Sequence, residues 1–213
     1  MITIVGAGPG TREYMTPEAA SAIASSRVII GGARVLDAVD LPREARRVEL
    51  PASGMAGAVA EALQRESGGD VTLLVSGDPG FYSLAKRVTS TYGRERVRIV
   101  PGISSIQLMS ARICRSWAGA SSVTMHGRSD LPVGELASRL RASSALVVLF
   151  GVPEDVEPQM KRLAADEELG NAWAALGWDL GLPDERIFEA NSLRELAPDP
   201  YRGRLSLLWL ERI

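Results

Sequence analysis

Short runs of β-branched residues alternate with alanine-rich stretches through the first hundred residues, and this alternation constrains the fold most. The apolar runs are continuous, and we expect strands at 2–5, 28–30, 71–75 and 97–100. We expect helices in between, one opened by Thr16-Pro17-Glu18 and others at 55–66 and 81–92. Continuously apolar strands separated by helices are typical of a parallel sheet covered on both faces. The pattern therefore predicts an α/β domain.

The second half is less regular but still mixes both kinds of element. We expect helices at 104–113 and 153–165, and strands at 121–125, 145–150, 171–176 and 205–210. The break in pattern falls between Pro101 and Gly119 and predicts two domains, 1–112 and 113–213.

Composition excludes several classes of site. Hydrophobic residues make up 46% and charged residues 23% of the 213, as in an ordinary globular protein. A single cysteine, Cys114, allows no intramolecular disulfide, and a single histidine, His126, excludes a zinc site built from several imidazoles, so we expect no metal. The net charge of −2 gives no reason to expect a nucleic-acid partner. With no apolar run of roughly 18 residues and no signal-like start, we expect a cytoplasmic protein without membrane contact.

Three loops that follow predicted strands are rich in glycine and proline: Gly6–Gly10, Ser76–Gly80 and Pro101–Ser105. Glycine lets a ligand approach the backbone closely, and proline keeps a loop stiff. Each loop alone can be just a tight strand-to-helix turn. Since ligands of open parallel sheets bind at the carboxyl ends of the strands, the three together predict a binding site there.

The first loop does not fit a dinucleotide-binding fingerprint. Thr11 stands where that fingerprint has its third glycine, and Pro9 lacks the backbone N–H that would donate a hydrogen bond to a phosphate. We therefore do not expect a nicotinamide or flavin cofactor.

These loops carry a family resemblance. GAGPG after the first strand, SGDPGFYSLAKR at 76–87 and VPGISSIQLMSAR at 100–112 resemble the tetrapyrrole (corrin/porphyrin) methylases over the whole of 1–213. GDPGFY, MHGR at 125–128 and LPDER at 182–186 are most similar to the members that methylate C5 of a precorrin or cobalt-precorrin in cobalamin biosynthesis. The resemblance implies a two-domain α/β fold, with a parallel sheet in the N-terminal domain, a mixed sheet in the C-terminal domain and the active-site cleft between them.

The resemblance also implies the cofactor S-adenosylmethionine, which leaves as S-adenosylhomocysteine. By position, the implied cofactor contacts are Gly77, Asp78, Phe81, Ser104, Ser105, Phe150, Gly151, Leu176, Gly177 and Leu205. A sulfonium methyl group is already activated, so its transfer to an electron-rich carbon needs alignment above all. Asp78 has an equally good alternative role, because aspartate commonly stabilises turns of this kind.

The first loop is implied to face the macrocycle, through Gly8, Pro9 and Gly10. Arg128 is the best arginine for a substrate carboxylate, since guanidinium and carboxylate pair through two hydrogen bonds. Further candidates are Arg12, Arg34 and Arg112. His126 either helps to move a proton at the macrocycle or is simply hydrogen-bonded at a strand end, so the catalytic residue stays open.

The resemblance further implies a homodimer and places methylation at C15, with its decarboxylation, on a separate polypeptide. Three alternatives remain. The first is a relative that methylates another precorrin position. A relative that methylates ribosomal RNA or a protein would need a basic face, of which the balance of 24 basic and 26 acidic residues gives no sign. A non-catalytic subunit that binds a tetrapyrrole would not need the cofactor loops.

Overall fold

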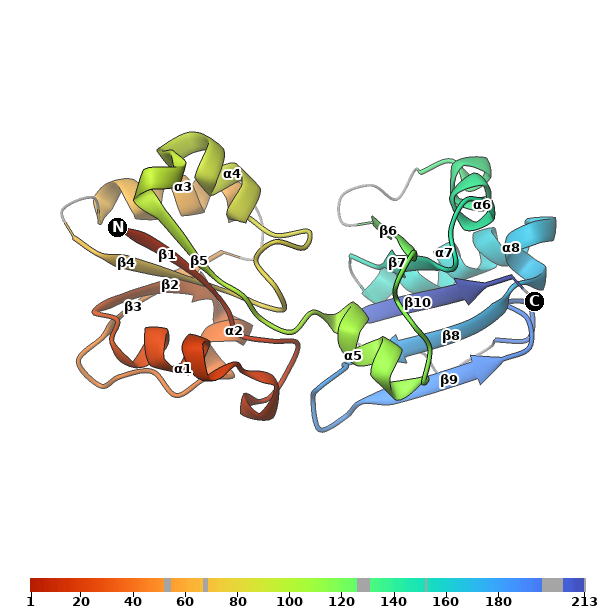
Figure 1. The fold of residues 1–213 in the computed structure, drawn as a ribbon, viewed down its shortest axis with the longest axis horizontal. Coiled ribbons are helices and arrows are strands. Elements are labelled where there is room, and N and C mark those ends of the chain that lie inside the picture. Colours follow the sequence, from red (N-terminus) through yellow and green to blue (C-terminus); the bar gives the residue numbers. More distant parts are fainter. Residues whose placement is uncertain (52–54, 67–68, 126–130, 152, 197–204, 213) are drawn as a thin grey trace. The chain divides into compact units, whose positions relative to one another are not determined.

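The computed structural model describes residues 1–51, 55–66, 69–125, 131–151, 153–196 and 205–212 (Figure 1). The chain forms two compact units, Met1–Ser104 and Ser105–Ile213, each with a sheet of its own. None of the helices within the described ranges is long and apolar enough to cross a membrane.

The sheet of the first unit has five strands, all parallel. Their order is β3 (Arg46–Leu50), β2 (Val28–Gly32), β4 (Val71–Val75), β1 (Ile2–Gly6) and β5 (Val97–Val100). The parallel sheet predicted from the apolar runs is thus confirmed, and β1 lies between β4 and β5.

Helices cover both faces of this sheet, which explains why its inner strands β1, β2 and β4 are largely apolar. Ile4 and Val5 are adjacent in β1, point to opposite faces and are both fully buried. The face of Ile4 packs against α3 (Met55–Arg65) and α4 (Ala85–Tyr92) (Figure 1). The face of Val5 packs against α1 (Pro17–Ala24) and α2 (Ala33–Asp37).

The sheet of the second unit is mixed, as expected. Its order is β6 (Ser121–Thr124), β7 (Leu146–Leu149), β10 (Ser206–Glu211), β8 (Trp173–Trp178) and β9 (Arg186–Ala190). The β6–β7 pair is parallel and the other three pairs are antiparallel.

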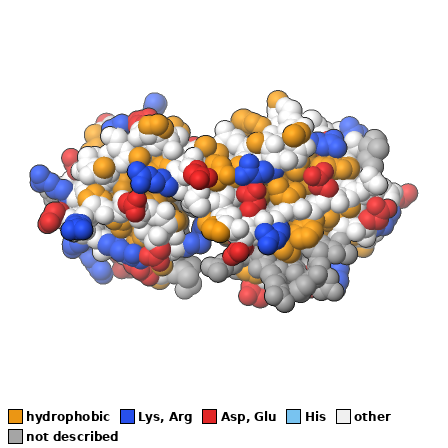
Figure 2. Space-filling model, turned by 90° about the horizontal axis from the view of Figure 1, so that it is seen from below, with side chains coloured by type: hydrophobic (Ala, Val, Ile, Leu, Met, Phe, Trp, Pro, Cys, Tyr) orange, Lys and Arg blue, Asp and Glu red, His pale blue; other side chains and the backbone are white. Residues whose placement is uncertain are grey.

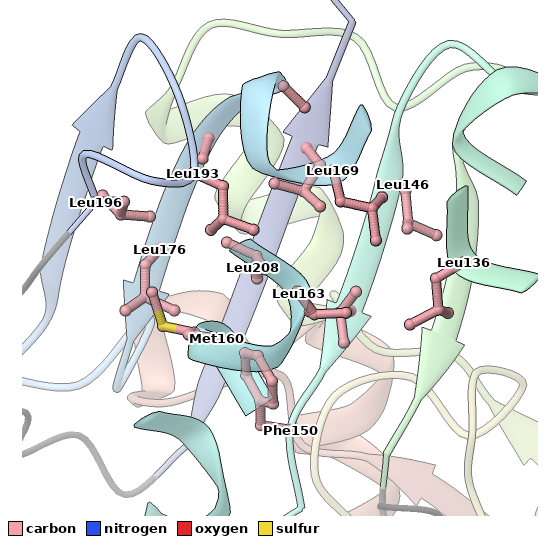
Figure 3. Close-up of a cluster of buried hydrophobic side chains, with 14 of the residues drawn as sticks. Leu136, Leu146, Phe150, Met160, Leu163, Leu169, Leu176, Leu193, Leu196 and Leu208 are labelled. Carbon is pink, nitrogen blue, oxygen red and sulfur yellow. The ribbon is translucent and has the colours of Figure 1, made fainter. Parts of the chain in front are cut away.

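One face of this second sheet carries the larger hydrophobic core. Leucines of β7, β8 and β10 interdigitate there with α6 (Val133–Arg141), α7 (Pro153–Ala164) and α8 (Glu167–Asn171) (Figure 3). Helix α5 (Ser105–Arg112) packs against the opposite face, where a Cβ atom on Gly177 would lie 2.8 Å from Met109 Sδ. Gly177 therefore lets this helix approach β8 closely.

Several local features differ from the sequence-based expectations. Helices α2, α6 and α8 were not predicted, and β8 begins two residues later than expected. The helix expected from Phe81 begins only at Ala85, because Tyr82 has a left-handed backbone (φ +46°) that no helix accommodates. Strands β3 and β9 were not expected, since both carry several exposed charged residues. The division between the units falls after Ser104 and not after Arg112, because α5 packs with the second sheet.

We predict that Thr16→Ala lowers the free energy of unfolding by about 1 kcal/mol. Thr16 Oγ1 accepts a hydrogen bond from the Ala19 N–H (3.1 Å) and caps α1. Thr16→Ser keeps the hydroxyl and should stay close to the unsubstituted protein. Denaturant unfolding measures both, and equal losses in the two variants would argue against the cap.

Candidate active site

The three glycine- and proline-rich loops meet at one edge of the first sheet. They follow β1, β4 and β5, which are neighbours in the order β4-β1-β5 and run in parallel. Carboxyl ends of parallel strands share an edge, and this is the edge where α/β sheets bind ligands.

Backbone hydrogen bonds join the first two loops. The Gly77 N–H donates to the Gly8 carbonyl oxygen (2.8 Å), and the Gly8 N–H donates to the Gly77 carbonyl oxygen (3.4 Å). The Ala7 N–H donates to the Val75 carbonyl oxygen at 2.8 Å. These bonds hold the loop after β1 against the loop after β4.

The third loop packs against the other two without room for a side chain. A Cβ atom on Gly102 would lie 2.3 Å from the Gly77 carbonyl oxygen and 2.8 Å from that of Gly6. A Cβ atom on Gly6 would lie 2.5 Å from the same Gly77 oxygen. Because these obstacles are backbone atoms, they cannot move aside cheaply, and the three main chains fit together only through glycine.

Asp78 fixes the geometry of the same edge through both carboxylate oxygens. Oδ1 accepts a hydrogen bond from the Gly80 N–H (2.7 Å), and Oδ2 accepts one from the Gly102 N–H (3.2 Å). The turn-stabilising role considered for Asp78 is therefore present, and the side chain also joins the second loop to the third.

Gly77 differs from Gly6 and Gly102. Its backbone is left-handed (φ +66°), and a Cβ atom there would have as nearest neighbours Ser104 Cα at 3.9 Å and Ile103 O at 4.0 Å. Glycine is thus required here by conformation and not by crowding. A side chain at this position would meet those atoms only at ordinary van der Waals distances.

The remaining predicted residues of this edge are placed as follows. Phe81 is half-buried and makes an edge-to-face contact with Tyr82, at 4.6 Å between ring centroids. Ser104 is buried, and Ser105 begins α5. Gly8, Pro9 and Gly10 are buried; Gly8 has φ +80°, and a Cβ atom on it would lie 2.6 Å from Tyr14 O.

In the second unit, the predicted cofactor residues lie at the ends of neighbouring strands. The Phe150 N–H donates to the Ser206 carbonyl oxygen (3.0 Å), and Ser206 pairs with Trp178, so the ends of β7 and β8 and the start of β10 lie in one row. Phe150 and Leu176 point into the hydrophobic core and are almost fully buried (Figure 3). They can therefore reach a ligand only through their main chain.

Comparison with known proteins identifies the family. Residues 1–197 match the tetrapyrrole (corrin/porphyrin) methylases. The chain belongs to this family. It is accordingly an S-adenosylmethionine-dependent C-methyltransferase, and both the predicted family and the predicted cofactor are confirmed.

Two relatives illustrate this similarity. A cobalt-precorrin-7 C(5)-methyltransferase of Salmonella typhimurium is 31% identical over 188 residues, which cover 88% of this methylase and 89% of that protein. A probable cobalt-precorrin-7 C(5)-methyltransferase of Methanocaldococcus jannaschii is 31% identical over 133 residues, less than two thirds of either chain: 61% of this methylase and 62% of that protein.

Solved structures share the fold. A precorrin-6Y methylase from Archaeoglobus fulgidus superposes with a TM-score of 0.75 and 23% identity, over 100% of this methylase and 98% of that chain. A uroporphyrin-III C-methyl transferase from Thermus thermophilus, in complex with S-adenosyl homocysteine, superposes with a TM-score of 0.70 and 23% identity, over 99% and 96%. The two-sheet α/β architecture of the methylase is thus that of its family.

Only some of the candidate catalytic and substrate residues lie within the described ranges. His126 and Arg128 lie outside the described residues. Arg12 is exposed and pairs with Asp40 (3.1 Å), and Arg112 pairs with Glu185 (2.6 Å). Arg112 is therefore engaged within the second unit, by a glutamate of the LPDER motif, and this pairing was not expected from the sequence.

Within the described ranges, no group of three or more His, Cys, Asp or Glu side chains could hold a metal ion. The candidate cofactor edge instead consists of backbone groups, small residues and one carboxylate. Such groups can bind and orient a sulfonium donor, which needs no strong acid or base for activation.

We predict that Gly102→Ala lowers the free energy of unfolding by at least about 2 kcal/mol, because the new methyl group would press on two carbonyl oxygens. Gly57→Ala is the matched control: nothing lies within 4 Å of its Cβ position in α3, so it should raise stability by about 0.5–1 kcal/mol. Denaturant unfolding of both variants tests this, and a Gly102→Ala protein as stable as the control would contradict the close approach.

We predict that Asp78→Asn costs about 1–3 kcal/mol of stability and also weakens binding of S-adenosylhomocysteine. An amide has one acceptor oxygen, so the N–H of either Gly80 or Gly102 loses its partner. Unfolding measurements and calorimetric titration give the two quantities. If Asp78 acted on the cofactor alone, affinity would fall while stability stayed unchanged.

Proposed function

We propose that this methylase transfers the methyl group of S-adenosylmethionine to C5 of a precorrin or cobalt-precorrin in cobalamin biosynthesis. The observation that carries the proposal is the joined loop edge of the first sheet, in which the GDPGFY residues take part. The names of the Salmonella and Methanocaldococcus relatives support the C5 position.

The proposed reaction is a direct displacement. The electron-rich C5 attacks the sulfonium methyl carbon, the new C–C bond forms as the C–S bond breaks, and the bonding electrons remain on sulfur. S-adenosylhomocysteine leaves, and the proton on C5 is lost. The contribution of the protein is to hold donor and acceptor in line, which can supply much of the rate enhancement.

We assign cofactor contacts to both units, in the order of the chain. They are Gly77, Asp78, Phe81, Ser104, Ser105, Phe150, Gly151, Leu176, Gly177 and Leu205. The uncrowded Cβ position of Gly77 supports a direct backbone contact there. The burial of Phe150 and Leu176 restricts their contribution to main-chain groups. Gly8, Pro9, Gly10 and Arg128 are assigned to the macrocycle.

The second candidate function is methylation at another precorrin carbon. A probable cobalt-factor III C(17)-methyltransferase of Methanothermobacter thermautotrophicus is 25% identical over 171 residues. Methylation of ribosomal RNA is less well supported, because acidic and basic side chains lie interspersed on the face seen in Figure 2. We also expect a cytoplasmic homodimer.

The deciding experiment supplies the purified protein with S-adenosylmethionine carrying a 13C-labelled methyl group. Precorrin intermediates are offered with and without cobalt, and the label is located by NMR. The proposal expects one labelled methyl at C5. Label at C17 would support the second candidate function, and no transfer to any macrocycle would contradict both.

We predict that Gly77→Val weakens S-adenosylhomocysteine binding by at least tenfold, because a branched side chain would occupy the uncrowded Cβ position and disfavour the left-handed backbone. Gly77→Ala should have a smaller effect. Calorimetric titration measures both affinities, and circular dichroism checks the fold. Unchanged affinity in a folded Gly77→Val protein would remove the second loop from the cofactor site.

A further inference from the structure

Asp179 stands out at the end of β8 in the second unit. Its side chain is almost fully buried (6% exposed), and its backbone is left-handed, with φ +49°. Aspartate enters this conformation more readily than most residues, so the backbone strain at this position is small. It directly follows Trp178, the last residue of the strand.

The Asp179 side chain replaces a missing carbonyl of the β-ladder. In the antiparallel β8–β10 pair, the last register partners are Trp178 and Ser206, so Asp179 and Leu205 would be the next pair. The Asp179 N–H donates to the Leu205 carbonyl oxygen at 2.8 Å, as a ladder bond would. The return bond from the Leu205 N–H goes to Asp179 Oδ1, at 3.2 Å.

The backbone carbonyl of Asp179 is used elsewhere. It accepts a hydrogen bond from the Leu182 N–H (2.9 Å) and closes the turn toward β9. This carbonyl is directed toward Leu182, and the Leu205 N–H donates to the carboxylate. The carboxylate therefore lets the chain leave β8 immediately while the first residue before β10 stays bonded.

The turn is fixed by a second carboxylate as well. Glu185 Oε2 accepts a hydrogen bond from the Gly181 N–H (2.7 Å), while its Oε1 accepts one from Arg112 Nε (2.6 Å). Since Arg112 ends α5, the segment 179–185 is connected to that helix. Asp179 thus sits in a rigid turn, well suited to hold a neighbouring main chain in place.

We propose that Asp179 is a positioning residue for the cofactor: it holds the main chain of Leu205 where the second unit contacts S-adenosylmethionine. The inference rests on the proposed function, which assigns Leu205 to the cofactor. Asp179 itself acts through Leu205.

Three substitutions separate the effect of the side-chain acceptor from the effect of the backbone conformation. Asp179→Asn keeps an acceptor oxygen and tolerates the left-handed backbone. Asp179→Gly keeps the backbone conformation and removes the acceptor, and Asp179→Ala removes both advantages. We expect the dissociation constant for S-adenosylhomocysteine to stay within about twofold for Asn, and to rise about three- to thirtyfold for Gly and further for Ala.

Asp166→Ala is the matched control. Asp166 Oδ1 accepts hydrogen bonds from the N–H groups of Glu168 and Leu169, both at 3.0 Å, and caps α8 in the same unit. This variant should lose stability and keep its cofactor affinity. Amide hydrogen exchange at Leu205 should be slow in the unsubstituted protein and in Asp179→Asn, and fast in Asp179→Gly.

The outcomes distinguish the two proposals. Unsubstituted protein that fails to bind S-adenosylhomocysteine would speak against the proposed cofactor site as a whole. Tight binding by the unsubstituted protein and equally tight binding by Asp179→Gly would overturn the positioning role alone. An affinity loss as large in Asp166→Ala as in Asp179→Gly would also overturn it, because the effect would then be general destabilisation.

Discussion

The close approach of three main chains at the carboxyl edge of the first sheet is the constraint on which the candidate site depends. The Gly77 carbonyl oxygen lies where a side chain on either Gly6 or Gly102 would have to stand. With the loops after β1, β4 and β5 in contact, little conformational freedom remains at the edge. A site of this kind is preorganised, so binding a small cofactor need not order the loops first.

Aspartate carboxylates secure the backbone in both units. The Asp78 carboxylate accepts hydrogen bonds from N–H groups of its own loop and of the loop after β5. The Asp179 carboxylate accepts a hydrogen bond from the Leu205 N–H, in place of a carbonyl of the β-ladder. At Asp179 the chain leaves β8 at once, and the short side chain supplies the acceptor for the Leu205 N–H. At Asp78 the side chain joins two loops. Hydrogen bonds to a charged acceptor are stronger than those to a neutral one, which suits them to this task.

Much of the fold could be predicted from the sequence because burial leaves a direct pattern. Strands β1, β2 and β4 of the first sheet are largely apolar, since helices cover both faces, and Thr16-Pro17 marks the start of α1. Strands β3 and β9 were missed because both lie at a sheet edge, carry exposed charged residues and lack that pattern. The late start of α4 was missed because the left-handed backbone of Tyr82 has no sequence signal of its own.

The sequence by itself determined the three glycine loops, because these depend on residue types at fixed local spacing, and the family and its cofactor followed from the resemblance that these motifs carry. Only the tertiary structure decided which glycines are crowded: Gly6 and Gly102 have no space for a side chain, while Gly77 does. It also decided that Arg112 is paired with Glu185 and that Asp179 bonds to Leu205. These partners are separated by many residues in the chain, and such distant contacts arise from packing, which no local pattern encodes.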